Sequence, residues 1–143
     1  MSYCTQQHLI DRFGADELIQ LTDSGGVGMI DSTTISAAII DASAEIDSYL
    51  RNRYALPLLA TPPEIERIAC HIARYYLYND SAINAVSQRF EQAIGWLKLL
   101  AQGKVMIDRQ YLTTTPHSNP LTGCSVATTT RVYSDTVLGK MIG

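Results

Sequence analysis

Residues 49–78, YLRNRYALPLLATPPEIERIACHIARYYLY, decide the fold, because they join two amphipathic helices through a proline-rich turn. In the turn, Thr61 precedes two prolines and Glu64. The Thr61 hydroxyl can accept a hydrogen bond from the backbone N–H of Glu64, whose carboxylate can accept one from the Thr61 N–H, as in a capping box. Pro62 suits the first helical position, where no N–H is needed and φ is already set. The spacing predicts a helix from Pro62 to about Tyr78.

Helical periodicity continues on both sides of this turn. Apolar residues recur at three- and four-residue steps, and turn-forming residues separate the runs. Asp31 can cap a long helix, residues 79–81 can stop one helix and cap the next, and Gly103 can end the last. The pattern predicts helical segments at about 5–13, 16–21, 32–53, 62–78 and 81–102. We therefore expect an all-α fold, a bundle of four to five helices.

The apolar stripes of the three long segments predict the core. Polar side chains lie mostly off these stripes, and alanines in the first long segment permit close approach of a neighbouring helix. The residues expected to face inward are Ile35, Ala38, Ile39, Ala42, Ile46, Tyr49, Leu50, Ile65, Ile68, Ala69, Ile72, Tyr76, Val86, Phe90, Ala93, Leu97 and Leu100.

Beyond Lys104 the apolar periodicity stops. Threonine runs at 113–115 and 128–130 flank an Asn-Pro pair and a glycine, which are turn formers. The closing segment 131–143, RVYSDTVLGKMIG, regains several apolar residues. We therefore predict a helical domain at 1–103 and an extended, partly flexible C-terminal arm at 104–143. We expect its end to become ordered only against a neighbouring subunit or partner; a flexible tail without a partner is the alternative.

Length and composition favour one ordinary globular domain. The chain has 143 residues, of which 46% are apolar and 17% charged, enough to bury a core without disulfides. It has neither a long apolar run nor a signal-peptide pattern, so we expect no membrane association and a protein that stays in the cytoplasm where it is made. Cys4, Cys70 and Cys124 share no zinc-type spacing, which predicts free thiols, with Cys70 in the core.

Charge is distributed unevenly along the chain. Residues 1–50 carry eight acidic residues and one arginine, whereas residues 51–109 carry eight basic and five acidic residues. Such asymmetry suits a head-to-tail oligomer, in which two different faces of one subunit meet. Ordinary solvated faces are the alternative interpretation. The overall charge of −3 argues against tight duplex binding, which requires neutralisation of phosphates.

Residues 23–31, DSGGVGMID, have the outline of a calcium-binding loop. Its third, fifth and twelfth positions are Gly25, Val27 and Thr34, so that only two carboxylates remain as ligands. A tight glycine turn, in which Asp31 caps the next helix, is the better interpretation. We expect no metal site.

Cysteine and histidine offer the one candidate for catalysis. Cys70 with His71 or His117 could form a nucleophile–base pair, but Cys70 and His71 are adjacent and diverge on a helix. No acidic partner for such a pair can be identified from the sequence. We therefore expect neither enzymatic activity nor a cofactor.

Tyrosines and arginines cluster on both sides of the proline-rich turn. Both residue types are enriched at protein interfaces, where an apolar body and a polar tip suit a partly wet contact. Stacking on nucleic acid is the alternative role. Because the chain is acidic overall, we favour the core and a subunit interface. The candidate interface residues are Arg51, Arg53, Tyr54, Arg74, Tyr75 and Tyr78, together with Arg131 and Tyr133 of the arm.

Four segments together resemble a known family. They are residues 12–23 (RFGADELIQLTD), 41–58 (DASAEIDSYLRNRYALPL), 62–78 (PPEIERIACHIARYYLY) and 131–135 (RVYSD). They are similar to small proteins encoded by Mu-like phages and prophages in the virion morphogenesis region. The resemblance covers about residues 3–103, with weaker agreement in the arm.

The resemblance implies a structural role. Members of this family look like head-to-tail connector, or adaptor, proteins of long-tailed phages, which are small all-α subunits that form a ring beneath the portal. It implies a homo-oligomeric ring in the virion neck, assembled in the host bacterial cytoplasm. The implied partners are the portal, tail-completion proteins and DNA that passes without sequence-specific binding. The alternative is a small binding module for nucleic acid or for another morphogenesis protein.

Overall fold

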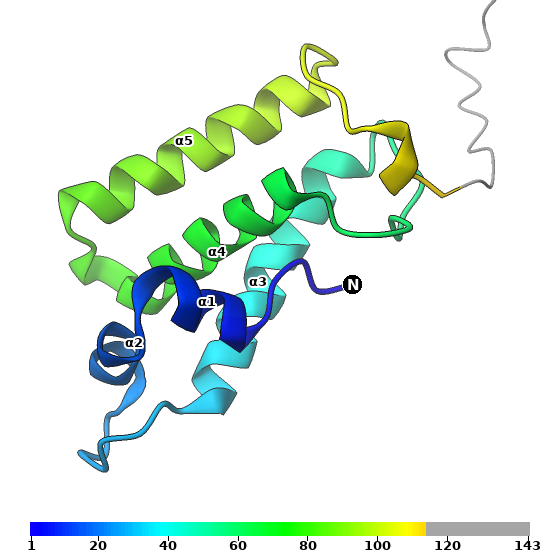
Figure 1. The fold of residues 1–143 in the computed structure, drawn as a ribbon. Coiled ribbons are helices and arrows are strands. Elements are labelled where there is room, and N and C mark those ends of the chain that lie inside the picture. The colour runs from blue at the N-terminus through cyan, green and yellow to red at the C-terminus, as the bar shows by residue number, and fades with distance from the viewer. Residues whose placement is uncertain (114–143) are drawn as a thin grey trace, which may run out of the picture.

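The computed structural model describes residues 1–113, and the rest of the predicted arm lies outside the described residues. Within residues 1–113 the chain is helical and contains no strand (Figure 1). The α-helices are α1 (Gln6–Phe13), α2 (Ala15–Thr22), α3 (Ser32–Leu50), α4 (Pro63–Tyr78) and α5 (Asn84–Ala101), and the short 3-10 helices are η1 (Asn79–Ser81) and η2 (Arg109–Tyr111). The predicted all-α fold is confirmed.

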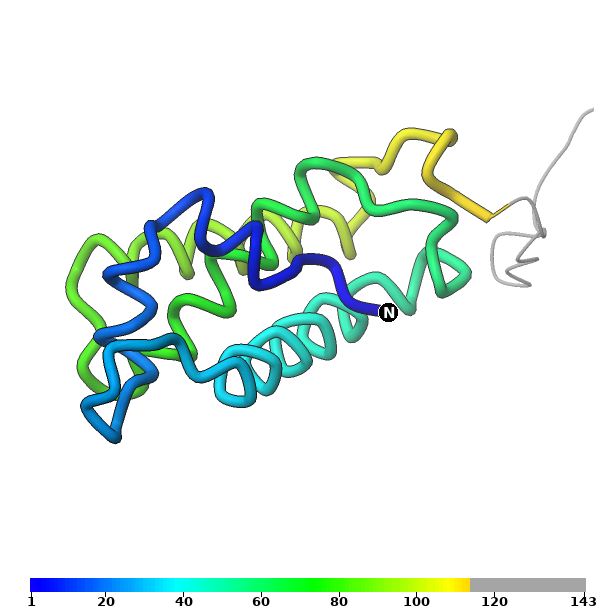
Figure 2. The backbone as a smooth tube through the Cα atoms, turned by 60° about the horizontal axis from the view of Figure 1, so that its bottom comes forward, coloured from blue at the N-terminus to red at the C-terminus, as the bar shows by residue number. Residues whose placement is uncertain are grey.

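Three long helices form the body of the bundle. α4 packs against both α3 and α5, and α3 also contacts α5. The short hairpin of α1 and α2 packs along α4 (Figure 1), since Arg12 of α1 pairs with Glu66 near the start of α4 and Glu17 of α2 pairs with Arg74 near its end. Seen from a second direction, α3 runs along one side of the molecule, with α4 and α5 on another (Figure 2). The surfaces of α3 and α5 are therefore available for different contacts.

The core follows the predicted apolar stripes. The side chains of Ile35, Ile46, Ile68, Ile72 and Leu97 are fully buried. Small residues of α3 and α4, among them Ala38, Ala42, Ala69 and Ala73, are also buried, which allows the two helices to approach closely. Of the predicted inward residues only Tyr49, Tyr76 and Phe90 are partly exposed. The periodicity therefore identified the core correctly.

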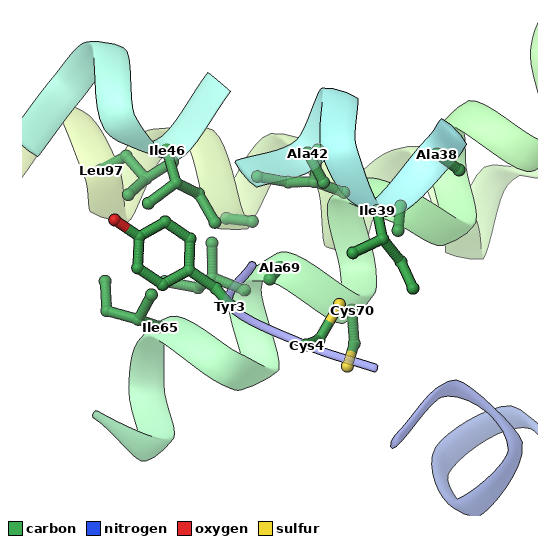
Figure 3. Close-up of a cluster of buried hydrophobic side chains, with 14 of the residues drawn as sticks. Tyr3, Cys4, Ala38, Ile39, Ala42, Ile46, Ile65, Ala69, Cys70 and Leu97 are labelled. Carbon is green, nitrogen blue, oxygen red and sulfur yellow. The ribbon is translucent and has the colours of Figure 1, made fainter. Parts of the chain in front are cut away.

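The N-terminal segment enters this core, which the sequence pattern did not predict. Tyr3 and Cys4 are buried between α3 and α4, close to Ile46 and Ile65 (Figure 3). The Tyr3 backbone N–H donates to Ser43 at 3.2 Å, and the Tyr3 hydroxyl donates to the Asp47 carboxylate. These polar contacts satisfy the groups that Tyr3 would otherwise bury without partners.

The predicted capping box at Thr61 is wrong. α4 begins at Pro63, and Pro62 is its N-cap with extended backbone angles and no side-chain cap. The reason is the second proline, because a residue that precedes proline is disfavoured in the helical region. Pro62 therefore cannot be the first helical residue, and Thr61 is displaced from the capping position. A capping box occurs instead at α1, between Thr5 and His8.

The predicted start of α5 at Ser81 is also wrong, since the helix begins at Asn84. Asn79 has a positive φ of 53°, and residues 79–81 form η1. The Ser81 hydroxyl donates to the Tyr78 carbonyl at 2.7 Å. Ser81 therefore provides a hydrogen-bond donor for the last carbonyl of α4 and does not cap α5.

Two predicted helix ends are confirmed. The Asp31 carboxylate accepts from the backbone N–H of Thr33 at 3.0 Å and caps α3. At the end of α5, Gly103 has a φ of +82°, and the Lys104 N–H donates to the Leu99 carbonyl at 3.0 Å, as in a Schellman motif. The C-terminal end of α3 differs from the prediction. The helix stops at Leu50 and not at Arg53.

The first residues of the predicted arm pack against the helices. The backbone N–H of Ile107, which is buried, donates to the hydroxyl of Tyr54 at 3.1 Å. The Leu59 N–H donates to the Tyr111 carbonyl at 2.9 Å. Residues near the start of the predicted arm are therefore held against the helical part of the chain.

Candidate assembly surfaces

The structure separates the predicted interface residues into two groups. Arg51, Arg53 and Tyr54 follow the end of α3, whereas Arg74, Tyr75 and Tyr78 lie at the far end of α4 (Figure 1). Arg131 and Tyr133 lie outside the described residues. The turn that joins the two groups in sequence therefore does not join them in space.

Several of these residues serve the fold. Tyr54 is only 9% exposed, and its hydroxyl holds Ile107 as described above. The Arg53 guanidinium lies against Gly103, where it occupies the space that a side chain would need. Tyr75 stacks on Phe90 with ring centroids 3.9 Å apart. Of the group that follows α3, Arg51 and Arg53 are exposed.

Arg74 is held by contacts within its own subunit. Its Nε donates to Glu17 at 2.6 Å and its Nη2 to the other carboxylate oxygen at 2.9 Å, a bidentate pair. Its guanidinium also lies 4.3 Å from the ring centroid of Phe13. The hydrogen bonds to Glu17 raise the pKa of Arg74. Arg74 therefore fastens the α1–α2 hairpin to α4, and much of its charge is neutralised.

Four arginines from three helices gather around His71, and we call them the arginine cluster: Arg12 of α1, Arg67 and Arg74 of α4, and Arg89 of α5. Arg12 forms an ion pair with Glu66 at 3.1 Å, and Arg74 is paired as above. Arg67 and Arg89 are exposed and have no ion-pair partner within residues 1–113. The cluster therefore offers two unpaired guanidinium groups to a partner.

His71 lies beneath these arginines as a neutral group. Its ring centroid lies 5.7 Å from that of Phe13, and its Nδ1 is buried without a hydrogen-bond partner within residues 1–113. Burial, and then the positive charges of Arg89, Arg67, Arg74 and Arg12, lower the pKa of His71 to about 4. Protonation of His71 is therefore resisted by the fold.

The lowered pKa of His71 makes the stability of the fold depend on pH. Between the folded pKa of about 4 and the ordinary value of 6.5, the unfolded chain binds the proton that the folded chain excludes. Stability should fall as pH decreases through this window, by at most about 1.4 kcal/mol per pH unit for one proton. His71→Phe, which keeps an aromatic ring against Phe13, should flatten the slope. Urea unfolding of both proteins at several pH values measures the difference, and parallel curves would contradict the prediction.

A surface of opposite charge lies on α3, and we call Asp41, Glu45 and the neighbouring Ile40 the acidic face. Asp41 and Glu45 line a shallow depression of about 420 Å³ together with Ala44, Ser48 and Tyr76. Burial, followed by the charges of Glu45 and Asp41, raises the pKa of Tyr76 to about 12. Ile40 is exposed beside this depression. The acidic face thus combines negative charge with an uncovered apolar side chain.

A third surface lies where the end of α5 approaches the start of α4. A pocket of about 600 Å³ opens there, and we call it the C-terminal pocket. Its walls are mostly apolar and carry two acidic groups and one arginine. The lining residues are Trp96, Val105, Met106, Ile107, Tyr111 and Leu112, with Glu64, Asp108 and Arg109.

The glycine loop is a turn, as predicted. The Asp23 carboxylate accepts from the backbone N–H groups of Val27 at 2.9 Å and Gly28 at 2.6 Å, and these bonds lower its pKa. Gly26 and Gly28 have positive φ angles, which the turn requires. Among residues 1–113 no group of three or more His, Cys, Asp or Glu side chains is placed to hold a metal ion.

Cys70 is in the core, as predicted, and is fully buried next to Cys4 (Figure 3). Both are free thiols. The contact with Cys70 and burial raise the pKa of Cys4, which disfavours its thiolate. His117, the other base considered, lies outside the described residues.

Comparison with known proteins identifies the family. The family model described as Bacteriophage Mu, Gp36 matches residues 3–122. The chain belongs to the Mu Gp36 family. It is 35% identical over 105 residues to the Mu-like prophage FluMu protein gp36 of Haemophilus influenzae, covering 73% of this chain and 74% of that protein. It is 31% identical over 105 residues to gene product J of Escherichia phage Mu, with the same coverage.

Family membership confirms the resemblance to proteins of Mu-like phages that the four segments indicated. The match to the Gp36 family extends to residue 122, past the anchored residues 104–113. None of the helices that the structure describes combines the length and apolarity needed to cross a membrane.

Proposed function

We propose that this Gp36-family protein is a structural protein of the phage neck. In this proposal it is a head-to-tail connector that closes into a ring below the portal and joins the capsid to the tail. It assembles in the host bacterial cytoplasm and contacts the portal and tail-completion proteins. Its role is assembly and not catalysis.

The observation that carries the proposal is the placement of opposite charges on different helices. The arginine cluster lies on α1, α4 and α5, and the acidic face lies on α3. A ring requires heterologous contacts, in which one patch of each subunit meets a different patch of the next. Complementary potentials steer such contacts and fix their orientation. The two surfaces therefore suit a repeated head-to-tail contact.

Net charge supports the same role. The chain carries a net charge of −3, whereas tight duplex binding requires many phosphate contacts from basic residues. A ring through which DNA passes must avoid holding it. An acidic subunit meets this requirement, provided that its unpaired arginines are covered by neighbouring copies.

Sedimentation over a range of concentrations tests the proposal. Self-association should be strongest at low ionic strength and weaken at about 1 M salt, where the Debye length falls to about 3 Å. Oligomers of one defined size support a closed ring. A protein that stays monomeric at every concentration and fails to bind portal would contradict the proposal.

A second function, a small module that binds nucleic acid, is favoured by one observation. Arg67 and Arg89 are exposed and have no ion-pair partner within the described residues, so their guanidinium groups could contact phosphates. Retention on DNA that decreases steeply with salt would support this function. Oligomer formation without such retention would support the connector.

A further inference from the structure

The C-terminal pocket is apolar, open and without an occupant from residues 1–113. Met106, one of its lining residues, is 72% exposed. Leu59, whose backbone bonds to Tyr111 of the lining, is also exposed. Exposed apolar side chains grouped around a concavity are typical of a site that another segment covers.

We propose that this pocket receives the end of the arm, residues 131–143, from a neighbouring copy of the same chain. The inference rests on the proposed ring, and it names the contact that links one subunit to the next. The first support is the position of the pocket relative to the end of the described chain. Leu112 lines the pocket, so the chain leaves the described residues at its edge with 30 residues still to follow.

The reach of the arm is sufficient. Segment 131–143 begins 18 residues beyond Thr113. Such a linker spans about 60 Å when extended and about 25 Å on average. α3, the longest helix, has 19 residues and is about 28 Å long. The closing segment can therefore reach the equivalent pocket one subunit away.

The chemistry of the two parts is complementary. The pocket has two acidic residues, Glu64 and Asp108, and one basic residue, Arg109. The closing segment has the opposite balance, with two basic residues, Arg131 and Lys140, and one acidic residue, Asp135. Val132, Tyr133, Val137 and Leu138 supply apolar side chains for the apolar wall. A pocket of about 600 Å³ accommodates a few such side chains and leaves the charged ones at its rim.

Two full-length variants test this contact. The pocket variant, Met106→Lys, keeps its arm, and the arm variant, Tyr133→Asp with Leu138→Asp, keeps its pocket. Met29→Lys is the matched control, because Met29 is 68% exposed but lies in the glycine loop, away from the pocket. Melting by circular dichroism checks that all of them remain folded. Sedimentation at about 1 M salt minimises contacts between charged surfaces.

We expect the pocket variant and the arm variant each to be monomeric on its own, with association weakened at least tenfold relative to wild type and to Met29→Lys. An equimolar mixture of the two should form dimers, since one intact arm can enter one intact pocket. A mixture that remains monomeric would overturn the inference. Wild-type protein that is already monomeric at this salt concentration, as expected if each arm occupies its own pocket, would overturn it as well. A pocket variant that assembles like wild type would overturn it too.

These outcomes are separate from the fate of the proposed function. If Met106→Lys still forms portal-bound rings, the pocket contact is refuted and the connector role stands. If wild-type protein neither forms rings nor binds portal, the connector role fails. In that event, dimers in the mixture would still show that the arm and the pocket bind each other.

Discussion

Ile46→Ala should lower the free energy of unfolding by about 2–5 kcal/mol, the range found when a buried isoleucine is truncated in a packed core. Ile46 is 0% exposed, and it lies on α3 beside Tyr3 and Leu97, where α3 and the N-terminal segment meet (Figure 3). Truncation leaves a cavity that fully packed neighbours fill only in part. The midpoint of urea unfolding, compared at equal m-value, measures the loss.

Ile40→Ala is the matched control for this prediction. Ile40 lies on the same helix, but it is 61% exposed, so the same truncation should change stability by less than about 0.5 kcal/mol. Equal effects at the two positions would contradict the placement of Ile46 on the core-facing side of α3 and of Ile40 on its solvent-facing side. Retained oligomerisation in Ile40→Ala would further show that the acidic face does not depend on this side chain.

Reversing two charges in the arginine cluster should weaken self-association at least tenfold at low salt. The change is Arg67→Glu with Arg89→Glu, because these are the members without an ion-pair partner in the described chain. Like charges would then meet across the contact with the acidic face of the next copy. Sedimentation gives the association constant, and the difference from wild type should shrink at about 1 M salt.

Two further variants separate a docking surface from a general effect of net charge. Lys98→Glu with Lys104→Glu changes the net charge by the same amount at exposed positions outside the cluster, and it should leave association near the wild-type value. Asp41→Lys with Glu45→Lys should restore association when mixed with the reversed arginine variant. Equal weakening by the lysine variant, or no rescue in the mixture, would refute the pairing of these surfaces.

The sequence predicts those features that depend on local spacing. The stripes of Ile35, Ile46, Ile68 and Leu97 identified the core because a helical period repeats over many residues. Helix ends were less predictable where two signals competed. Thr61 had the spacing of a capping box, but the second proline excluded helical geometry at Pro62.

Contacts between distant segments could not be predicted from spacing. Arg74 and Glu17 are separated by 57 positions, and Tyr54 and Ile107 by 53. The arginine cluster draws on three helices, so no short motif marks it. Burial of the N-terminal segment likewise depends on the space between α3 and α4. The tyrosine–arginine pattern around the turn identified exposed groups at Arg51 and Arg53, but it could not separate them from Tyr54, which is buried.

Electron microscopy of the protein, alone at high concentration and mixed with its cognate portal, tests the central claim most directly. We expect closed rings of one size, with one ring seated on one end of each portal. Mixtures in which portal remains bare while this protein stays monomeric, or forms open filaments that do not bind it, would contradict the connector account.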